Sequence, residues 1–331
     1  MGLFSWALKG SYKRYYKDLV ELSKHNGKSA NLMFLDTAFS VIIFKSGLQD
    51  YLNYKFYEKS FKERKEYATI GYQDRLYKLA ASPKYADFFS NKVNFHKNFK
   101  EFVKREYACY EDGFDKVNKF IKDRDYLIRK PISGLGGHDV EMIPTYEIPD
   151  VKEFYNKLKE DDCYIEDLVI QNKEWNKLNP DSLNTIRAVT KCINGNSELI
   201  FAVARIGSGE SIVDNFHRGG VGIKVNIEKG CLEGLTINKA NVESETTTKT
   251  NVKVDGFIIP YWNEVVEMVN EAAKVNDKVN IVGWDVAITE NGPLIIEGNR
   301  GPGMDIIQVL YQRGIKPDLE KIRKEIIEGK K

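Results

Sequence analysis

Three oxygen-bearing side chains near the C-terminal end of the sequence have the spacing of a divalent-metal site. Asp285 precedes the turn-forming segment TENGP (289–293), and Glu297 and Asn299 follow it. If the flanking apolar runs form a hairpin that turns about Asn291, Asp285 lies opposite Glu297, and Asn299 shares their face because strand side chains alternate. Such hard oxygen ligands suit Mg²⁺ or Mn²⁺. The alternative is a pair of solvated carboxylates on an exposed sheet face, which the strongly apolar neighbours disfavour.

A glycine-rich segment follows a predicted strand and could contact phosphate. Lys130 lies at the end of the strand, and Ser133, Gly134, Gly136 and Gly137 follow it closely. Glycines let backbone N–H groups approach phosphate oxygens, and the lysine supplies a compensating charge. The segment is not a Walker loop, whose lysine follows the glycines, nor a dinucleotide fingerprint, which opens a helix. Two interpretations stay open: a hairpin that folds over a triphosphate, and a plain β-hairpin turn.

Arginines and polar residues around a second glycine pair form a third group. Arg187 and Arg205 lie on neighbouring predicted strands, and Asn215, His217 and Arg218 lie just before two glycines. Guanidinium groups beside backbone N–H groups suit an oxyanion or a phosphoryl group in transfer. The alternative, equally weighted on these residues alone, is a set of surface arginines that cap turns.

Two differently patterned parts of the chain must position these groups. Up to about residue 125 the sequence is rich in Lys, Tyr and Phe, with apolar residues at helical spacing. From Tyr126 onward, short β-like runs alternate with glycine turns. The expected strands cover 126–132, 163–170, 185–193, 199–206, 221–227, 256–260, 280–288 and 293–299, and the expected helices cover 150–160, 261–276 and 317–329. The pattern predicts an α+β body behind a helical N-terminal region.

Composition narrows the class of protein. The 331 residues are 42% hydrophobic and 30% charged, as in ordinary globular proteins, and the net charge of +2 gives no reason to expect a nucleic-acid partner. The four cysteines are far apart, without a CxxC pair, so we expect free thiols in a reducing compartment; these are Cys109, Cys163, Cys192 and Cys231. The four histidines are scattered, and no zinc site is expected.

Two apolar segments raise the question of a membrane. Residues 32–44 are too few to span a bilayer and contain Asp36, which favours a buried helix. Residues 1–19 are apolar first and then basic, without the cleavage site of a signal peptide. For this N-terminal helix, docking on its own domain is favoured over contact with a membrane surface, which stays open. We therefore expect a cytoplasmic protein, with attachment to the inner face of the membrane as the alternative.

In their order along the chain, the segments RKP…SGLGG, NFHRGG and IEGN resemble those of the ATP-grasp superfamily. They look closest to the sugar-transfer-associated ATP-grasp branch, with a secondary likeness to ribosomal-protein glutamate ligases. The resemblance covers residue 91 to the end and, more loosely, part of the helical region. It implies an ATP-grasp fold, in which two α+β lobes grip ATP. It also implies a helical region at 1–90, an N-terminal lobe at 91–168 and a C-terminal lobe at 169–331.

The resemblance also implies roles for individual residues. Lys92 and Lys130 match lysines that contact the ATP phosphates, and Ser133, Gly134, Gly136 and Gly137 match the loop that closes over them. Glu166, Asp167 and Leu168 look like the strand that reads adenine through its backbone and ribose through a carboxylate, with Gln171 as an alternative ribose contact. Asp285, Glu297 and Asn299 match the metal ligands. Arg187, Arg205, Asn215 and Arg218 match residues that hold the γ-phosphate and an acyl phosphate. His138 departs from the pattern, because many relatives have Lys or Arg there, and the role of His217 is open.

The implied activity is that of an ATP- and Mg²⁺-dependent (or Mn²⁺-dependent) ligase. It would join a carboxylate to an amine through an acyl phosphate, with a uronic acid in surface-polysaccharide assembly as the candidate acceptor. Two alternatives stay open: a kinase on the same fold, and a catalytically inactive nucleotide-binding scaffold. The three residues of the predicted metal site argue against the scaffold.

Overall fold

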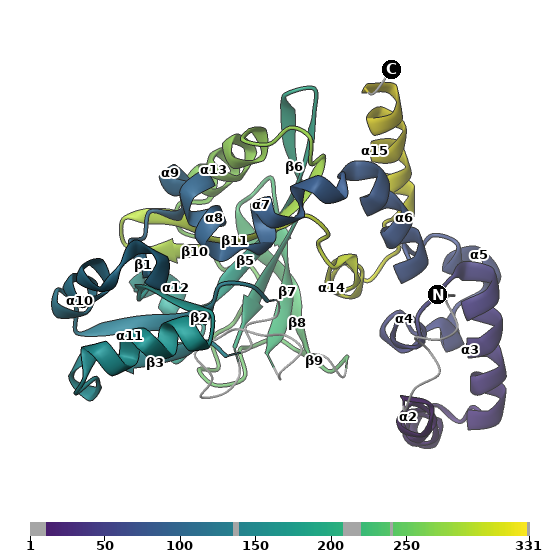
Figure 1. The fold of residues 1–331 in the computed structure, drawn as a ribbon. Helices are drawn as coiled ribbons and strands as arrows, with labels where there is room; N and C mark the ends of the chain where they lie inside the picture. The colour runs from purple at the N-terminus through teal and green to yellow at the C-terminus, as the bar shows by residue number, and fades with distance from the viewer. Residues whose placement is uncertain (1–10, 135–138, 208–219, 239–240, 330–331) are drawn as a thin grey trace. The chain divides into compact units, whose positions relative to one another are not determined.

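The computed structural model describes residues 11–134, 139–207, 220–238 and 241–329 (Figure 1). Contacts group the chain into two compact units, one formed by residues 1–79 with 303–327 and the other by residues 80–302 with 328–331. We call them the helical unit and the sheet unit. Residues 303–327 thus pack with the N-terminal helices, although the sequence places them after the C-terminal lobe. The three-part division by function stays a prediction.

The helical unit contains helices from both ends of the chain. They are α2 (Ser11–Asn26), α3 (Ala30–Phe44), α4 (Leu48–Asn53), η1 (Phe56–Glu58), α5 (Phe61–Arg64), α6 (Ile70–Ala80), α14 (Met304–Leu310) and α15 (Lys316–Gly329). Aromatic side chains dominate its core, with Tyr51, Tyr54 and Phe56 almost fully buried. The side chain of Gln308 joins the two ends, because its Oε1 accepts from the Ala68 amide at 2.7 Å and its Nε2 donates to the Tyr54 hydroxyl at 2.9 Å.

Helix α3 corrects the expectation for residues 32–44. The segment is helical, but only the side that carries Met33, Thr37 and Ser40 is buried. Large apolar side chains on the other side are exposed, including Leu32 and Leu35. An apolar sequence alone does not reveal which side a helix buries, because that depends on the helices packed against it.

The sheet unit begins with short helices and then alternates helices with strands. Its helices are η2 (Pro83–Tyr85), α7 (Ala86–Ser90), α8 (Lys92–Asn98), α9 (Lys100–Val103), η3 (Tyr110–Asp112), α10 (Phe114–Lys122), η4 (Thr145–Glu147), α11 (Val151–Glu160), α12 (Lys173–Asn176) and α13 (Trp262–Lys274). Its strands are β1 (Tyr107–Cys109), β2 (Tyr126–Pro131), β3 (Glu141–Pro144), β4 (Cys163–Asp167), β5 (Thr185–Ile193), β6 (Asn196–Ile206), β7 (Val221–Asn226), β8 (Cys231–Asn238), β9 (Glu243–Ser244), β10 (Ile281–Thr289) and β11 (Gly292–Asn299).

The strands form two antiparallel sheets, each with its own core (Figure 1). The smaller sheet has the order β1-β4-β2-β3, and α10 and α11 supply the helical side of its core. The larger sheet has the order β11-β10-β5-β6-β7-β8-β9, and one of its faces packs on α13 and on the phenylalanines of α7 to α9. The alternation of helices and antiparallel strands confirms the predicted α+β class.

Most predicted elements are present, with one exception. Residues 256–260 form no strand, although Ile258 makes an isolated bridge to Cys231. The four cysteines are free thiols, as expected. None of the helices in the described part of the chain has the length and apolar character needed to cross a membrane.

Candidate active site

A row of charged side chains crosses three neighbouring strands of the larger sheet. Glu297 on β11 is the register partner of Asp285 on β10, and Asp285 is in turn the partner of Arg187 on β5. Gly283 pairs with Asn299, which places that amide two residues farther along β11 on the same face. The predicted convergence of Asp285, Glu297 and Asn299 is therefore confirmed as a position in the fold, while their role as metal ligands stays a prediction.

The register depends on a β-bulge that the sequence did not reveal. The loop between β10 and β11 is Glu290–Asn291, since Thr289 pairs with Gly292, so the hairpin does not turn about Asn291 as expected. With that loop alone, Asp285 would face Ile296. A bulge between the Asp285 and Val286 positions adds one residue to β11 and brings Glu297 opposite Asp285. The bulge therefore aims the second carboxylate at the first.

Asp285 is almost fully buried and is held by two arginines. Its Oδ1 accepts from Nε of Arg187, its Oδ2 accepts from Nη2 of Arg187 at 3.0 Å, and Nη2 of Arg205 lies 2.8 Å from Oδ2. Although burial raises the pKa of Asp285, the charges of Arg187 and Arg205 outweigh it and lower this pKa to about 2. Arg205 also donates to Oγ1 of Thr185 at 2.8 Å. The two arginines predicted to hold phosphate thus flank the predicted metal ligand.

Glu297 has the opposite electrostatic situation. Burial raises its pKa, and the neighbouring charge of Asp285 raises it further, against the weaker effects of Arg187 and Asn299. Asn299 donates to Oε1 of Glu297 at 3.2 Å. Two carboxylates side by side repel each other unless a cation or a proton lies between them. Arg187 and Arg205 compensate the charge of Asp285, so Glu297 is the less stabilised carboxylate of the pair.

The donor set fits Mg²⁺ or Mn²⁺ only if other oxygens complete the coordination. Among residues that the structure describes, no three His, Cys, Asp or Glu side chains are grouped as a metal site. Asp285, Glu297 and Asn299 offer two carboxylates and one amide. Mg²⁺ is commonly bound through one or two carboxylates while phosphate oxygens and water occupy its other positions. The chemistry of these three side chains suits that mode of binding.

Gly298 shows why the strand between two of these residues needs a glycine. A Cβ there would lie 2.9 Å from the ring atoms of Phe95 and Trp284. The backbone of β11 is therefore pressed against aromatic side chains of the core on one face, while Glu297 and Asn299 point to the other.

Lys92 and Lys130 lie near each other, Lys92 at the start of α8 and Lys130 on β2 of the smaller sheet. Lys92 is the first residue of α8, and its Nζ donates to the Gly134 carbonyl at 3.1 Å. Burial lowers the pKa of Lys92, and the nearby charge of Lys130 lowers it further. The charges of Glu297 and Glu166 raise it. Ser133 and Gly134 lie exposed after β2, and Gly134 has a φ of 132°, which favours glycine.

Glu166 is the centre of a buried hydrogen-bond network, and its role in ribose recognition stays a prediction. Its side chain accepts from Nε2 of His96 at 2.7 Å, from Nη1 of Arg105 at 2.7 Å, from Nζ of Lys130 and from the Tyr164 hydroxyl at 3.0 Å. A carboxylate has about four acceptor positions, so this one is saturated. Burial would raise the pKa of Glu166, but Arg105 and then Lys130 hold it well below its usual range.

The other candidates for ribose recognition are also bound within the protein. Asp167 accepts from Nε of Arg124 at 2.6 Å and from the Glu106 amide at 2.7 Å. Gln171 donates to the Ser182 carbonyl at 2.7 Å and accepts from the Asn184 amide at 3.0 Å. These side chains hold the fold together at β4 and after it. Leu168 follows β4 and is half-buried, so only its backbone keeps the predicted role.

Arg105 links the two sheets, and sequence reasoning missed it. Its Nη1 donates to Glu166, while its Nη2 donates to the carbonyls of Ile295 at 3.3 Å and Ile296 at 3.0 Å. These two carbonyls lie at the bulge that aims Glu297. His96 was missed as well. Neither residue lies in a motif, and their partners are 61 to 191 residues away along the chain, so no local pattern could have found them.

Part of the predicted site lies outside the described residues. This applies to Gly136 and Gly137 of the glycine-rich segment, to His138, and to Asn215, His217 and Arg218. Their predicted roles stay predictions.

Three solved ligases and synthetases match this chain at low sequence identity. The chain has 12% identity to ATP-grasp ligase PsnB complexed with its minimal precursor, covering 76% of this chain and 63% of that one, with a TM-score of 0.45. For the D-alanine–D-alanine ligase from Coxiella burnetii, the identity is 14%, the coverage 76% and 60%, and the TM-score 0.44. For the D-cycloserine synthetase DcsG, the identity is 10%, the coverage is 77% of each chain, and the TM-score is 0.44. The chain thus spans less than two thirds of the first two proteins.

The sequence itself identifies the family. Among curated proteins, none matches it. The family model for sugar-transfer associated ATP-grasp matches residues 72–324, which is well over half of the chain. This match confirms the predicted ATP-grasp fold, and helices α2 to α7 confirm the helical N-terminal region. The chain belongs to the sugar-transfer associated ATP-grasp family.

Proposed function

We propose that this protein is an ATP-dependent carboxylate–amine ligase that works through an acyl phosphate, with a sugar carboxylate such as a uronic acid as the acceptor. The observation that carries the proposal is the row of Arg205, Arg187, Asp285 and Glu297 on one face of the larger sheet. Lys92 adds a positive charge close enough to interact with Glu297. Buried carboxylates flanked by cations suit the binding of a metal–triphosphate complex.

Asp285, Glu297 and Asn299 would hold Mg²⁺ or Mn²⁺, which when bound would neutralise charge on the ATP phosphates. Lys92 on α8 and Lys130 on β2 would attract the phosphates. Arg187 and Arg205 lie beside Asp285 and would stabilise the negative charge that develops during phosphoryl transfer.

The reaction has two balanced steps. A carboxylate oxygen of the acceptor attacks the γ-phosphorus, the bond to the ADP oxygen breaks, and an acyl phosphate and ADP form. The amine nitrogen then attacks the acyl carbon, phosphate leaves with the electrons of the C–O bond, and the nitrogen loses a proton to give the amide. Exclusion of water from the site would protect the acyl phosphate from hydrolysis.

The sugar acceptor rests on the family description, because sugar transfer is the process with which the family is associated. A carboxylate is the sugar substituent that can attack phosphorus and then accept an amine. Uronic acids and nucleotide-linked uronic acids are therefore the first acceptors to test, and the amino acids are the first amines.

The test is a matrix of carboxylates and amines incubated with the protein, ATP and Mg²⁺. ADP and phosphate release are measured, and each product mass is determined. A product that has the mass of both substrates less water supports the ligase. A product that has gained a phosphoryl group would indicate a kinase instead of a ligase. ADP release that needs no acceptor and yields no product would reject both activities.

A further inference from the structure

The outward side of α3 in the helical unit is apolar along most of its length. The exposed positions from 32 to 43 are Leu32, Leu35, Ala38, Phe39, Ile42 and Ile43. Leu32, Leu35 and Ile42 are 66%, 65% and 57% exposed, which is unusual for such large side chains. Their spacing places them on one side of the helix. A contiguous apolar surface of this kind marks a site of interaction.

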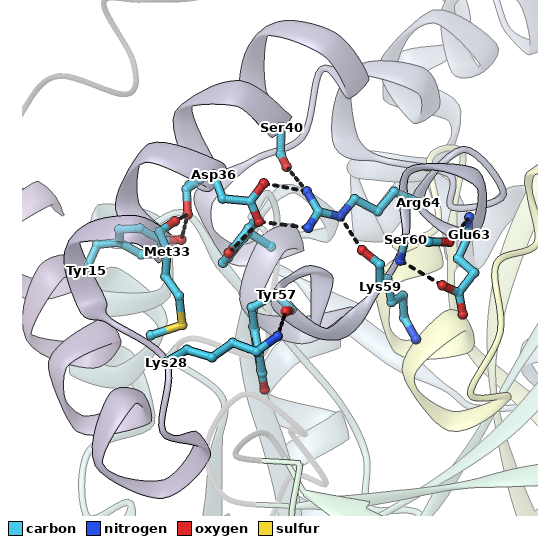
Figure 2. A network of polar contacts seen from close by, with 12 residues as sticks. Tyr15, Lys28, Met33, Asp36, Ser40, Tyr57, Lys59, Ser60, Glu63 and Arg64 are labelled. Carbon is cyan, nitrogen blue, oxygen red and sulfur yellow. Dashed lines mark hydrogen bonds and ion pairs between the residues drawn. The ribbon is translucent and has the colours of Figure 1, made fainter.

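The one charged residue of α3 is bound on the inner side. Figure 2 shows Asp36 facing Arg64, whose Nη1 and Nη2 each donate to one carboxylate oxygen at 2.7 Å. The Tyr51 hydroxyl donates to Asp36 at 2.9 Å, and Nη1 of Arg64 also donates to Ser40 at 3.2 Å. This network holds α3 against α4 and α5, so its apolar side stays turned outward.

The apolar surface continues onto α5 and has a basic border. The ring of Phe61 is exposed and lies 6.4 Å from that of Phe39. The Nζ of Lys65 lies 4.5 Å from the centre of the Phe61 ring. Lys62 on α5 and Lys45 at the end of α3 are also exposed. We call Leu32, Leu35, Phe39, Ile42, Ile43 and Phe61 the α3 patch.

The charge around the patch indicates its partner. Residues 11–68 contain eleven Lys and Arg against seven Asp and Glu, a net charge of +4. Two of the acidic residues cap local structure, since Asp50 accepts from the Gly47 amide and Glu63 from the Ser60 amide. An apolar surface with a basic border suits the interface of a bilayer that contains anionic lipids. The exposed helix positions of the patch carry no polar side chain for the directed hydrogen bonds that protein interfaces usually contain.

We propose that the α3 patch docks on the surface of a bilayer that contains anionic phospholipids. The patch enters the boundary between headgroups and acyl chains, and Lys45, Lys62 and Lys65 contact lipid phosphates. Of α3, the outward side alone contributes to this contact, because the inner side is packed in the helical unit. The contact differs from the one considered for the N-terminal segment, and it does not depend on the ligase reaction.

The test is co-sedimentation of the full chain with mixed phosphatidylglycerol–phosphatidylcholine vesicles and with pure phosphatidylcholine vesicles. We expect binding to the mixed vesicles that weakens as salt is added. The double variant Leu35→Gln/Ile42→Gln should bind about a hundredfold more weakly, because each of the two lost apolar side chains costs roughly tenfold. Both positions are mostly exposed, so the fold should persist, as thermal unfolding would check.

The matched control is Val242→Gln/Ile258→Gln, which makes similar changes at exposed positions of the sheet unit, 60% and 67% exposed. It should bind vesicles like the unmodified protein. Equal loss in both double variants, or no binding of the unmodified protein to mixed vesicles, would overturn the proposal. The unmodified protein could instead form a dimer without binding vesicles, while Leu35→Gln/Ile42→Gln is a monomer. That result would overturn the proposal and assign the surface to contact with a second copy of the chain.

Discussion

Glu166 in the smaller sheet and Glu297 in the larger sheet are glutamates with opposite surroundings. Glu166 accepts from His96, Arg105, Lys130 and Tyr164, and the charges of Arg105 and Lys130 hold its pKa well below the usual range. Glu297 lies beside Asp285, and burial together with that negative charge raises its pKa. One carboxylate is saturated by protein donors, whereas the other shares a site with a like charge. The difference separates a residue that holds the fold from one that we propose binds a cation.

Glu297→Gln tests the site with the largest expected effect. The change keeps the shape of the side chain but removes the charge, so ADP release should fall by about a thousandfold. Thermal stability without metal should be unchanged or higher, because the repulsion with Asp285 disappears. The matched control is Glu228→Gln, at an exposed glutamate in a turn, which should leave turnover unchanged. Undiminished ADP release by Glu297→Gln would refute the assignment of the site.

Glu166→Gln should instead act on stability. It leaves Arg105 and Lys130 buried without their anionic partner, and the free energy of unfolding should fall by about 3 kcal/mol. Denaturant unfolding measures this loss. A variant as stable as the unmodified protein would mean that the network contributes little to the fold.

The acid sensitivity of the protein should follow from the same glutamate. Its folded-state pKa is lowered, so its contribution to stability is fully present above the unfolded value near 4.5 and is lost as the pH falls through the folded-state pKa. Below pH 4.5, the free energy of unfolding should therefore fall more steeply with decreasing pH for the unmodified protein than for Glu166→Gln. Parallel curves would contradict the direction of the pKa shift.

Arg105→Lys should have a smaller effect that reaches the proposed metal site through the bulge. A lysine cannot donate to Glu166 and to the carbonyls of Ile295 and Ile296 together, so Glu297 should be held less well. We expect kcat/KM to fall by about tenfold, with a weaker apparent affinity for Mg²⁺. Arg129→Lys is the control, because Arg129 bonds Glu141 and Asp161 at the smaller sheet instead. An unchanged dependence on Mg²⁺ would leave Arg105 a purely structural role.

Asp167→Asn should have the smallest effect. Asp167 is bound to Arg124 and to the Glu106 amide, so the KM for ATP should stay within about twofold of its original value. A tenfold rise in this KM, without loss of stability, would support the predicted role of Asp167 in ribose recognition.

The local part of the architecture could be predicted because it follows from local chemistry. Short apolar, β-like runs predicted β5, β6, β10 and β11, and turn residues predicted the β10–β11 hairpin. The strand period of two placed Asp285, Glu297 and Asn299 on one face. The predicted centre of the turn was wrong. The bulge at Ile296 shifts the register by one residue, and Asp285 therefore still pairs with Glu297 as predicted.

What only the tertiary structure decided concerns partners that are far apart along the chain. Sequence alone could not assign Glu166 to a four-donor network, pair Arg187 and Arg205 with Asp285, or turn one apolar side of α3 outward. Periodicity and turn preference act over a few residues, so they can be recognised from the sequence alone. Saturation of a buried charge and burial of a helix side depend on which distant segments pack together, and that is settled only when the chain folds.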